Sequence, residues 1–150
     1  MKRTDVTELV VEAKIRKGLT WGEIAAHIGR PKVWTTAALL GQHPFTPQDA
    51  AAVVDLLELP DEAVLVLAVV PYRGGLPTAV PTDPTIYRFY EALQVYGPAL
   101  KELIHEEFGD GIMSAINFRL DIGHTEHDGF EHVVVTFDGK FLPYAWPTED

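Results

Sequence analysis

Hydrophobic residues recur at helical spacing along most of the first seventy residues of the chain. Leu9, Val10 and Ala13 fall on one face of a first helix, which should end near Gly18 because glycine is the usual residue just past a helix end. Glycine and proline then divide the chain into further short segments, and Thr20 with Glu23 has the spacing of a capping box. The pattern predicts a compact bundle of short helices, helix-turn-helix-like around residues 25–33.

An apolar run and a connector follow this bundle. Residues 61–70, DEAVLVLAVV, predict a buried helix that ends at Pro71. The next stretch, PYRGGLPTAVPTD, is rich in proline and glycine and therefore predicts an extended connector. We place the domain boundary there. Residues 1–75 are expected to form an N-terminal helical bundle, and residues 76–150 a C-terminal catalytic and oligomerisation domain.

A long helical pattern opens the C-terminal half. Asp83 and Pro84 mark its start, because an aspartate side chain can accept amide hydrogens at a helix N-terminus and proline fits the first helical position. Pro98 should kink this helix or force it to restart, since proline lacks an amide donor and clashes with the preceding turn. Gly109 should cap its end.

The period of the hydrophobic pattern changes to two after residue 114. Apolar residues at 116, 118, 120 and 122 alternate with polar ones, which predicts a strand with one buried face. A second strand is expected over residues 133–137, and Asp138-Gly139 is a hairpin signal that leads into a third strand at 140–142. The predicted class is α+β: an N-terminal helical bundle, then a C-terminal helix and a small antiparallel sheet that dimerises.

Two charged residues stand out on the long helix. Arg88 and Glu91 are three residues apart and therefore project from nearly the same side. One interpretation is an ordinary surface ion pair. However, Tyr87, Phe89 and Tyr90 make this stretch too aromatic for a typical solvated face, which favours a partly buried, functional pair.

Composition and charge narrow the possible functions. The formal net charge of -10 argues against nonspecific attraction to nucleic acid or anionic membranes, so an anionic substrate needs a local positive pocket. The chain has no cysteine, which excludes disulfides, thiolate catalysis and cysteine-ligated metal. No run approaches the roughly 18 apolar residues of a membrane helix, and the N-terminus has no apolar signal core. We expect a cytoplasmic protein without membrane contact.

A group of histidines is a candidate metal site. His124, His127 and His132 lie near Glu126 and Asp128. Their spacing fits no helix face, and glycines at 123 and 129 indicate a turn between strands. A solvated loop is therefore the favoured interpretation, and no metal site is predicted.

Four longer motifs resemble those of a known family, the cyanases (cyanate hydratases or cyanate lyases). They are TAALLGQ at 36–42, YRFYEALQVYG at 87–97, FGDGIMSAINFRLD at 108–121 and FDGKFLP at 137–143. The resemblance covers the whole C-terminal half and extends into the helical N-terminal half. It implies bicarbonate-dependent decomposition of cyanate to ammonia and carbon dioxide through carbamate, with bicarbonate as co-substrate and neither a metal nor an organic cofactor.

The same resemblance implies site residues and an assembly. Matched by motif, the catalytic residues are Arg88, Glu91 and Ser114. An arginine can clamp the two anionic reactants, a serine hydroxyl can position one of them, and the glutamate can orient the arginine or handle protons. The implied assembly is a homodecamer, a pentamer of dimers, with active sites between subunits.

The alternative function is a helix-turn-helix DNA-binding regulator with a C-terminal sensing and dimerisation domain. Charge weighs against it, because residues 1–70 carry seven Lys and Arg against nine Asp and Glu. The candidate recognition helix, PKVWTTAALL, also has Lys32 but no Arg, Asn or Gln to read base edges. No nucleic-acid partner is therefore expected.

Overall fold

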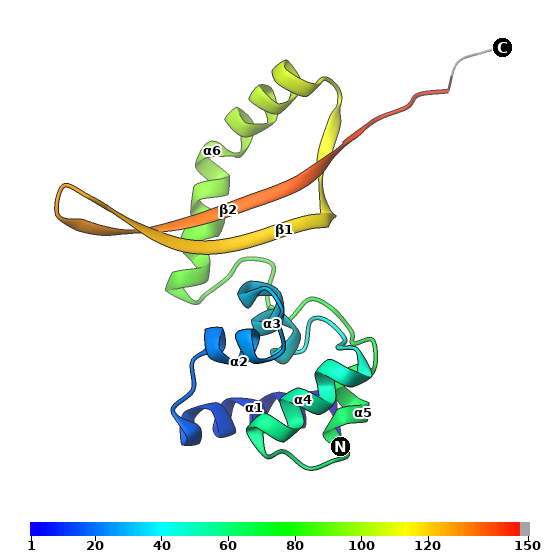
Figure 1. Cartoon of the computed structure of the whole chain (residues 1–150). Helices are drawn as coiled ribbons and strands as arrows, with labels where there is room; N and C mark the ends of the chain where they lie inside the picture. Colours follow the sequence, from blue (N-terminus) through cyan, green and yellow to red (C-terminus); the bar gives the residue numbers. More distant parts are fainter. Residues whose placement is uncertain (148–150) are drawn as a thin grey trace. The chain divides into compact units, whose positions relative to one another are not determined.

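The computed structural model describes residues 1–147, and these residues divide into two compact units (Figure 1). The first unit spans Met1–Gly75 and the second begins at Leu76. The first contains only helices, whereas the second contains a long helix followed by two antiparallel strands. This arrangement confirms the predicted α+β class.

The first unit consists of helices whose ends match the predicted capping residues. Gly18 ends the first helix in the left-handed conformation, with φ 65°. Thr20 and Glu23 form the predicted capping box, in which each side chain bonds to the other residue's backbone amide. The helices are α1 (Arg3–Lys17), α2 (Trp21–His27), α3 (Lys32–Leu39), α4 (Pro47–Leu57) and α5 (Ala63–Ala68).

The first unit has a hydrophobic core to which all five helices contribute. Fully buried aliphatic residues from each helix meet there: Val6, Val10, Ile24, Leu39, Val53, Leu57 and Leu67. The predicted burial of the apolar run at 61–70 is only partly observed. Ala63 and Leu67 of α5 are buried, but Leu65, on the opposite face of the same short helix, is 74% exposed.

The second unit begins with α6 (Pro84–Phe108). Asp83 caps it as predicted, because its Oδ1 accepts hydrogen bonds from the amides of Thr85 and Ile86. Pro98 lies inside this helix and does not end it; the ribbon continues but changes direction near its middle (Figure 1). Gly109 caps the other end.

The two strands, β1 (Gly111–His127) and β2 (Phe130–Pro143), form one long hairpin. Its turn is Asp128-Gly129, where both residues have positive φ (54° and 80°) and His127 pairs with Phe130. The predicted turn at Asp138-Gly139 is wrong, because both residues lie within β2. A turn at 128–129 lets both strands pair over nearly their whole length, so the sheet has two strands and not three.

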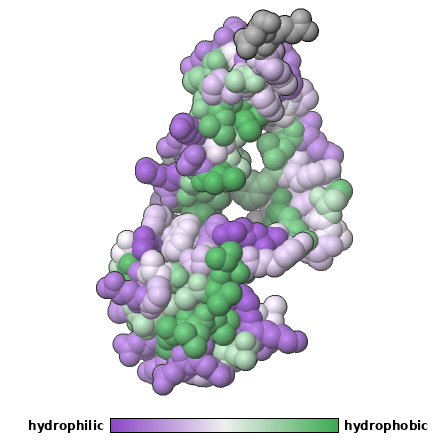
Figure 2. Space-filling model, turned by 90° about the vertical axis from the view of Figure 1, so that its right-hand side faces the viewer, coloured by the Kyte–Doolittle hydropathy of each residue, from purple (hydrophilic) through white to green (hydrophobic). Residues whose placement is uncertain are grey.

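The second unit buries very little of its own surface. Among residues 76–147, only Pro81, Gly111 and Ser114 are buried, and α6 contributes none of them. Hydrophobic side chains instead remain on the surface and line a hollow in one face of this unit (Figure 2). Such a unit lacks the core that normally stabilises a helix and hairpin in water.

Candidate functional site

Arg88 and Glu91 form the ion pair that their spacing on α6 predicts. The Arg88 Nη1 donates to Glu91 Oε2 at 3.0 Å, and the Arg88 guanidinium carbon lies 5.6 Å from the centre of the Tyr87 ring. Their side chains are 65% and 52% exposed. The predicted partial burial is therefore wrong for the single chain, because the aromatic neighbours do not cover the pair.

Exposure leaves most of the Arg88 guanidinium free for a ligand. Arg88 has five N–H donors in a planar fork, and Glu91 takes one of them in the observed bond. The remaining donors can form paired hydrogen bonds to an oxyanion. Glu91 holds the guanidinium from one side and thereby restricts its orientation.

Ser114 lies on β1, where the pairing with β2 is interrupted. Met113 pairs with Phe141, and the next paired residue of β1 is Phe118, opposite Gly139. Residues 114–117 therefore form a large, irregular bulge opposite a single residue of β2. Within this bulge the Ser114 Oγ accepts hydrogen bonds from the amides of Ile116 at 3.1 Å and Asn117 at 2.9 Å. The residue is only 4% exposed.

The three predicted site residues do not form one connected group within a chain. Across residues 1–147, no hydrogen bond or ion pair joins Ser114 to Arg88 or Glu91. Arg88 and Glu91 lie near the start of α6, whereas Ser114 lies near the start of β1. A single chain therefore presents an anion-binding arginine and a buried serine as separate groups.

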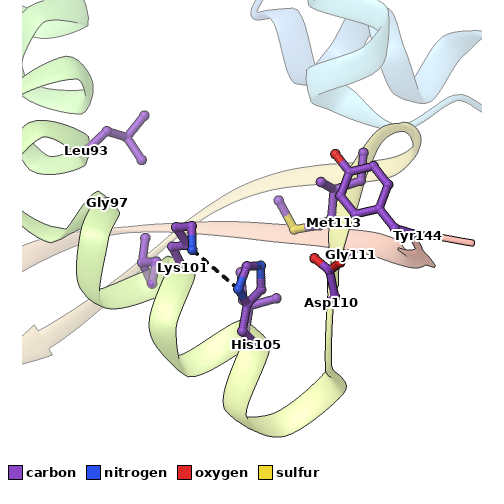
Figure 3. Close-up of a pocket in the computed structure, with 11 residues that line it drawn as sticks. Leu93, Gly97, Lys101, His105, Asp110, Gly111, Met113 and Tyr144 are labelled. Atoms are coloured by element: carbon purple, nitrogen blue, oxygen red, sulfur yellow. Dashed lines mark hydrogen bonds between the residues drawn. The ribbon is translucent and has the colours of Figure 1, made fainter. Parts of the chain in front are cut away.

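A pocket of about 610 Å³ opens between the second half of α6 and the start of β1 (Figure 3). Leu93, Leu100 and Ile104 give it an apolar wall, with Met113 and Tyr144 also lining it. At its edge Lys101 Nζ approaches His105 Nδ1 at 3.4 Å. Nothing in the sequence pattern singled out this pocket, although the helical spacing of the three α6 residues accounts for its apolar wall. Arg88, Glu91 and Ser114 do not line it.

The histidine group lies at the tip of the hairpin. His124 and His132 belong to paired strands, opposite Val133 and Thr125, so the predicted loop is wrong except at its two-residue turn. The rings of His127 and His132 meet edge to face at 5.0 Å. In the part of the chain that the structure describes, no three His, Asp or Glu side chains are grouped to hold a metal ion.

In the first unit, burial is the largest cause of a pKa shift for two groups, His43 and Arg3. Burial lowers the pKa of His43, and the charge of Arg73 lowers it further. Burial also lowers the pKa of Arg3, whose guanidinium donates to the carbonyl oxygens of Val66, Ala38 and His43. Both groups act within the helical unit, and neither belongs to the predicted site.

Two family models together match most of the chain. The model described as the N-terminal domain of cyanate hydratase matches residues 3–71, and the one described as the cyanate lyase C-terminal domain matches residues 78–146. Arg88, Glu91 and Ser114 all fall within the second match.

Full-length relatives and a solved structure agree with these matches. A protein named cyanate hydratase from Mycolicibacterium vanbaalenii is 63% identical over 150 residues, which covers 100% of this chain and 98% of the relative. One from Dechloromonas aromatica, with the same name, is 56% identical and covers 96% of this chain and 98% of the relative. The crystal structure of cyanase from T. urticae is 41% identical with a TM-score of 0.83, over 94% of this chain and 99% of that one.

Proposed function

The chain belongs to the cyanate hydratase family, and we propose that it decomposes cyanate with bicarbonate to ammonia and carbon dioxide. The observation that carries this function is the 63% identity to a cyanate hydratase, because that match spans the whole chain and so covers both domains. The chain is an enzyme, a lyase of the cyanate hydratase type.

The reaction brings two anions together. A bicarbonate oxygen attacks the cyanate carbon, a C–O bond forms, and the nitrogen takes up the bicarbonate proton and one proton from solution. Loss of one carbon dioxide leaves carbamate. Carbamate then takes up a second proton from solution and breaks its C–N bond to give ammonia and a second carbon dioxide. The site must therefore offset the repulsion of the reactants and deliver protons.

Arg88 is proposed to offset this repulsion. Its guanidinium is permanently charged, and its donors beyond the one bonded to Glu91 remain open. An arginine can hold the flat carboxylate part of bicarbonate by two parallel hydrogen bonds, or bind the linear cyanate end-on. Its positive charge also stabilises the negative charge that builds up as the new bond forms.

Glu91 and Ser114 are proposed to support that binding. Glu91 fixes one side of the guanidinium. We also propose that its carboxylate takes up a proton from solution and passes it to the carbamate nitrogen. The Ser114 hydroxyl positions one reactant by a hydrogen bond, which reduces the entropic cost of aligning two small ions. Because Ser114 is only 4% exposed, small ions such as cyanate are suited to reach it.

The proposed site is shared between subunits of a homodecamer built as a pentamer of dimers. Two observations support this proposal. Arg88 and Ser114 have no bond to each other in the described part of one chain, and the second unit leaves its apolar side chains exposed. A site at an interface can collect Arg88 from one subunit and Ser114 from another, and can present more than one arginine to the two anions.

Ammonia release from cyanate, measured with and without added bicarbonate, tests the proposed function. We expect ammonia only when both anions are present, with two molecules of carbon dioxide formed for each ammonia. A chelator should not change the rate, since the proposed chemistry uses no metal. Ammonia release that does not depend on bicarbonate would contradict the proposal.

The remaining expectations concern location and nucleic acid. None of the helices within residues 1–147 is long and apolar enough to cross a membrane. We retain the cytoplasm as the proposed location, which fractionation of cells producing the protein can test. No observation favours the alternative of a DNA-binding regulator, and we expect no salt-sensitive binding to duplex DNA.

A further inference from the structure

The bulge that carries Ser114 is large for a β-hairpin. Between the pairs Met113–Phe141 and Phe118–Gly139, β1 advances by five residues while β2 advances by two. The three additional residues of β1 must loop out of the ladder. Two amides of this loop, those of Ile116 and Asn117, donate to the Ser114 Oγ instead of to the opposite strand. The Ser114 side chain thus stabilises the looped-out residues by these two hydrogen bonds.

These two hydrogen bonds also define what the Ser114 hydroxyl can offer a ligand. A serine oxygen has two acceptor lone pairs and one hydrogen to donate. With both lone pairs facing backbone amides, the hydroxyl can interact with a ligand only as a donor. Cyanate and fully ionised carboxylate groups accept hydrogen bonds. The bulge therefore leaves Ser114 able to donate the hydrogen bond that an anion accepts.

Gly139 provides the space in which the bulge folds back. A Cβ atom at this position would lie 2.5 Å from the Ser114 carbonyl oxygen and 2.4 Å from Met113 Cγ, closer than the 3.0 Å that such atoms respect. Its φ is not positive, so the need for glycine here is one of space and not of backbone conformation. The Met113 side chain can turn aside. The Ser114 carbonyl cannot move unless the Ser114–Ala115 peptide rotates, and this rotation disturbs the amides that follow.

We infer that Gly139 is a positioning residue for the reaction, because it allows the bulge in which Ser114 is fixed as a hydrogen-bond donor. The inference rests on the role proposed above for Ser114. Gly139 does not itself contact a substrate; it acts on the reaction through the backbone of its neighbour across the hairpin. Any side chain at position 139 should therefore misdirect the hydroxyl even in a correctly assembled protein.

The first test compares two glycine variants on the same hairpin. Gly123 on β1 pairs with Val134, and a Cβ atom added there meets nothing within 4 Å. We expect Gly123→Ala to keep near wild-type activity and Gly139→Ala to lose about 100-fold, the scale on which a small misplacement of a reacting group acts. Equal activity of the two variants overturns the inference.

Two double variants separate positioning from a general packing defect. If Gly139 acts through Ser114, Gly139→Ala should cost little more once Ser114→Ala is present, whereas independent effects multiply. Met113→Ala removes the side-chain clash but leaves the Ser114 carbonyl in place, so it should not rescue Gly139→Ala. Multiplied losses in the first pair, or rescue in the second, overturn the inference.

Hydrogen exchange of the assembled protein tests the bulge independently of whether Gly139→Ala folds. In Ser114→Ala the amides of Ile116 and Asn117 lose their acceptor, so the peptide that contains them should exchange faster than in the wild type. Unchanged exchange overturns the inference.

The activities of two single variants distinguish a failure of the proposed function from a failure of this inference. If Ser114→Ala alone is near wild type in activity, the role of Ser114 is wrong. If Ser114→Ala is inactive while Gly139→Ala is fully active, the role of Ser114 stands and only the inference about Gly139 is lost.

Discussion

At the scale of single residues, Arg88 combines an exposed position with a proposed central role. Its ion pair with Glu91 lies in solvent, and exposed pairs of this kind contribute about 0–1 kcal/mol to stability. The pair therefore does little for the fold of α6. The aromatic neighbours and the exposed guanidinium fit the proposed role in ligand binding. A substitution of Arg88 should therefore change activity without changing stability.

We predict that Arg88→Ala keeps the melting temperature within a few degrees but loses on the order of 100-fold to 1000-fold in kcat/KM, because the charge that offsets two anions is removed. Arg88→Lys should recover only part of this loss, since an ammonium group cannot form the paired hydrogen bonds. Calorimetry and steady-state ammonia release measure the two effects. Arg16→Ala, an exposed arginine on α1, is the matched control. Near wild-type activity of Arg88→Ala would place the site elsewhere.

His43 predicts a pH dependence of stability. Burial and the charge of Arg73 lower its pKa, and its ring stacks on Trp34 with 5.8 Å between centroids. In the unfolded chain its pKa is about 6.5, so below this pH the unfolded state binds more protons than the folded state. The contribution of neutral His43 is complete above about pH 6.5 and is lost as the pH falls through the lowered pKa.

Chemical denaturation at pH 7.5 and pH 5.5 measures this contribution. The wild type should lose more unfolding free energy between the two pH values than His43→Gln, whose side chain does not titrate. Other acidic and basic groups affect both proteins alike and cancel in the comparison. An identical loss in the two proteins would mean that His43 titrates normally in the folded chain.

At the scale of elements, the sequence predicted the ends of helices better than the pairing of strands. The caps at Gly18, Thr20, Asp83 and Gly109 depend on residues within a turn of each other, so the local sequence determines them. The hairpin turn depends on which of two Asp-Gly pairs lets the strands match over their length. The local sequence indicated a turn near Gly129 as well as one at Asp138-Gly139, and only the pairing of residues far apart in the chain decides that the second lies within β2.

The candidate site shows the same division. The spacing of Arg88 and Glu91 on one helix was enough to predict their ion pair. The exposure of that pair could not be predicted from its aromatic neighbours, because residue type alone does not show which other side chains cover a position. The bulge around Ser114 was also missed, since it depends on the register of β1 against Gly139 of β2. The three catalytic roles stay predictions.

The N-terminal cap of α6 carries a prediction of its own. Asp83 accepts hydrogen bonds from the amides of Thr85 and Ile86, so Asp83→Ala should cost about 1 kcal/mol in unfolding free energy. Asp83→Asn should retain most of this contribution, because its side-chain oxygen can accept the same bonds. Denaturant titration is the measurement. Asp55→Ala, an exposed acid within α4, is the control and should change stability little. A loss in Asp55→Ala equal to that in Asp83→Ala would show that the cap is not the cause.

At the scale of the whole molecule, the two units differ in how much of their hydrophobic surface they bury. The helical unit buries aliphatic side chains from all five of its helices, as an independently folding domain does. The other unit exposes hydrophobic residues on α6 and on both strands, and a two-stranded sheet has an open edge on each side. An isolated hairpin is marginal in water, so contacts with other copies of the chain are the simplest source of the missing burial.

Assembly through this second unit is therefore the last prediction, and Val133 tests it. Val133 on β2 is 73% exposed in the single chain, and Ile15 on α1 is 71% exposed, so glutamate at either position should be equally harmless to an isolated chain. If the hairpin lies in the subunit interface, Val133→Glu buries a charge and should dissociate the assembly and abolish activity, whereas Ile15→Glu should do neither. Light scattering with parallel activity assays gives the answer, and the wild type should have about ten times the chain mass of 16.6 kDa. A fully active wild-type monomer would refute both the assembly and the shared site, because nothing would then remain to bring Arg88 of one chain to Ser114 of another.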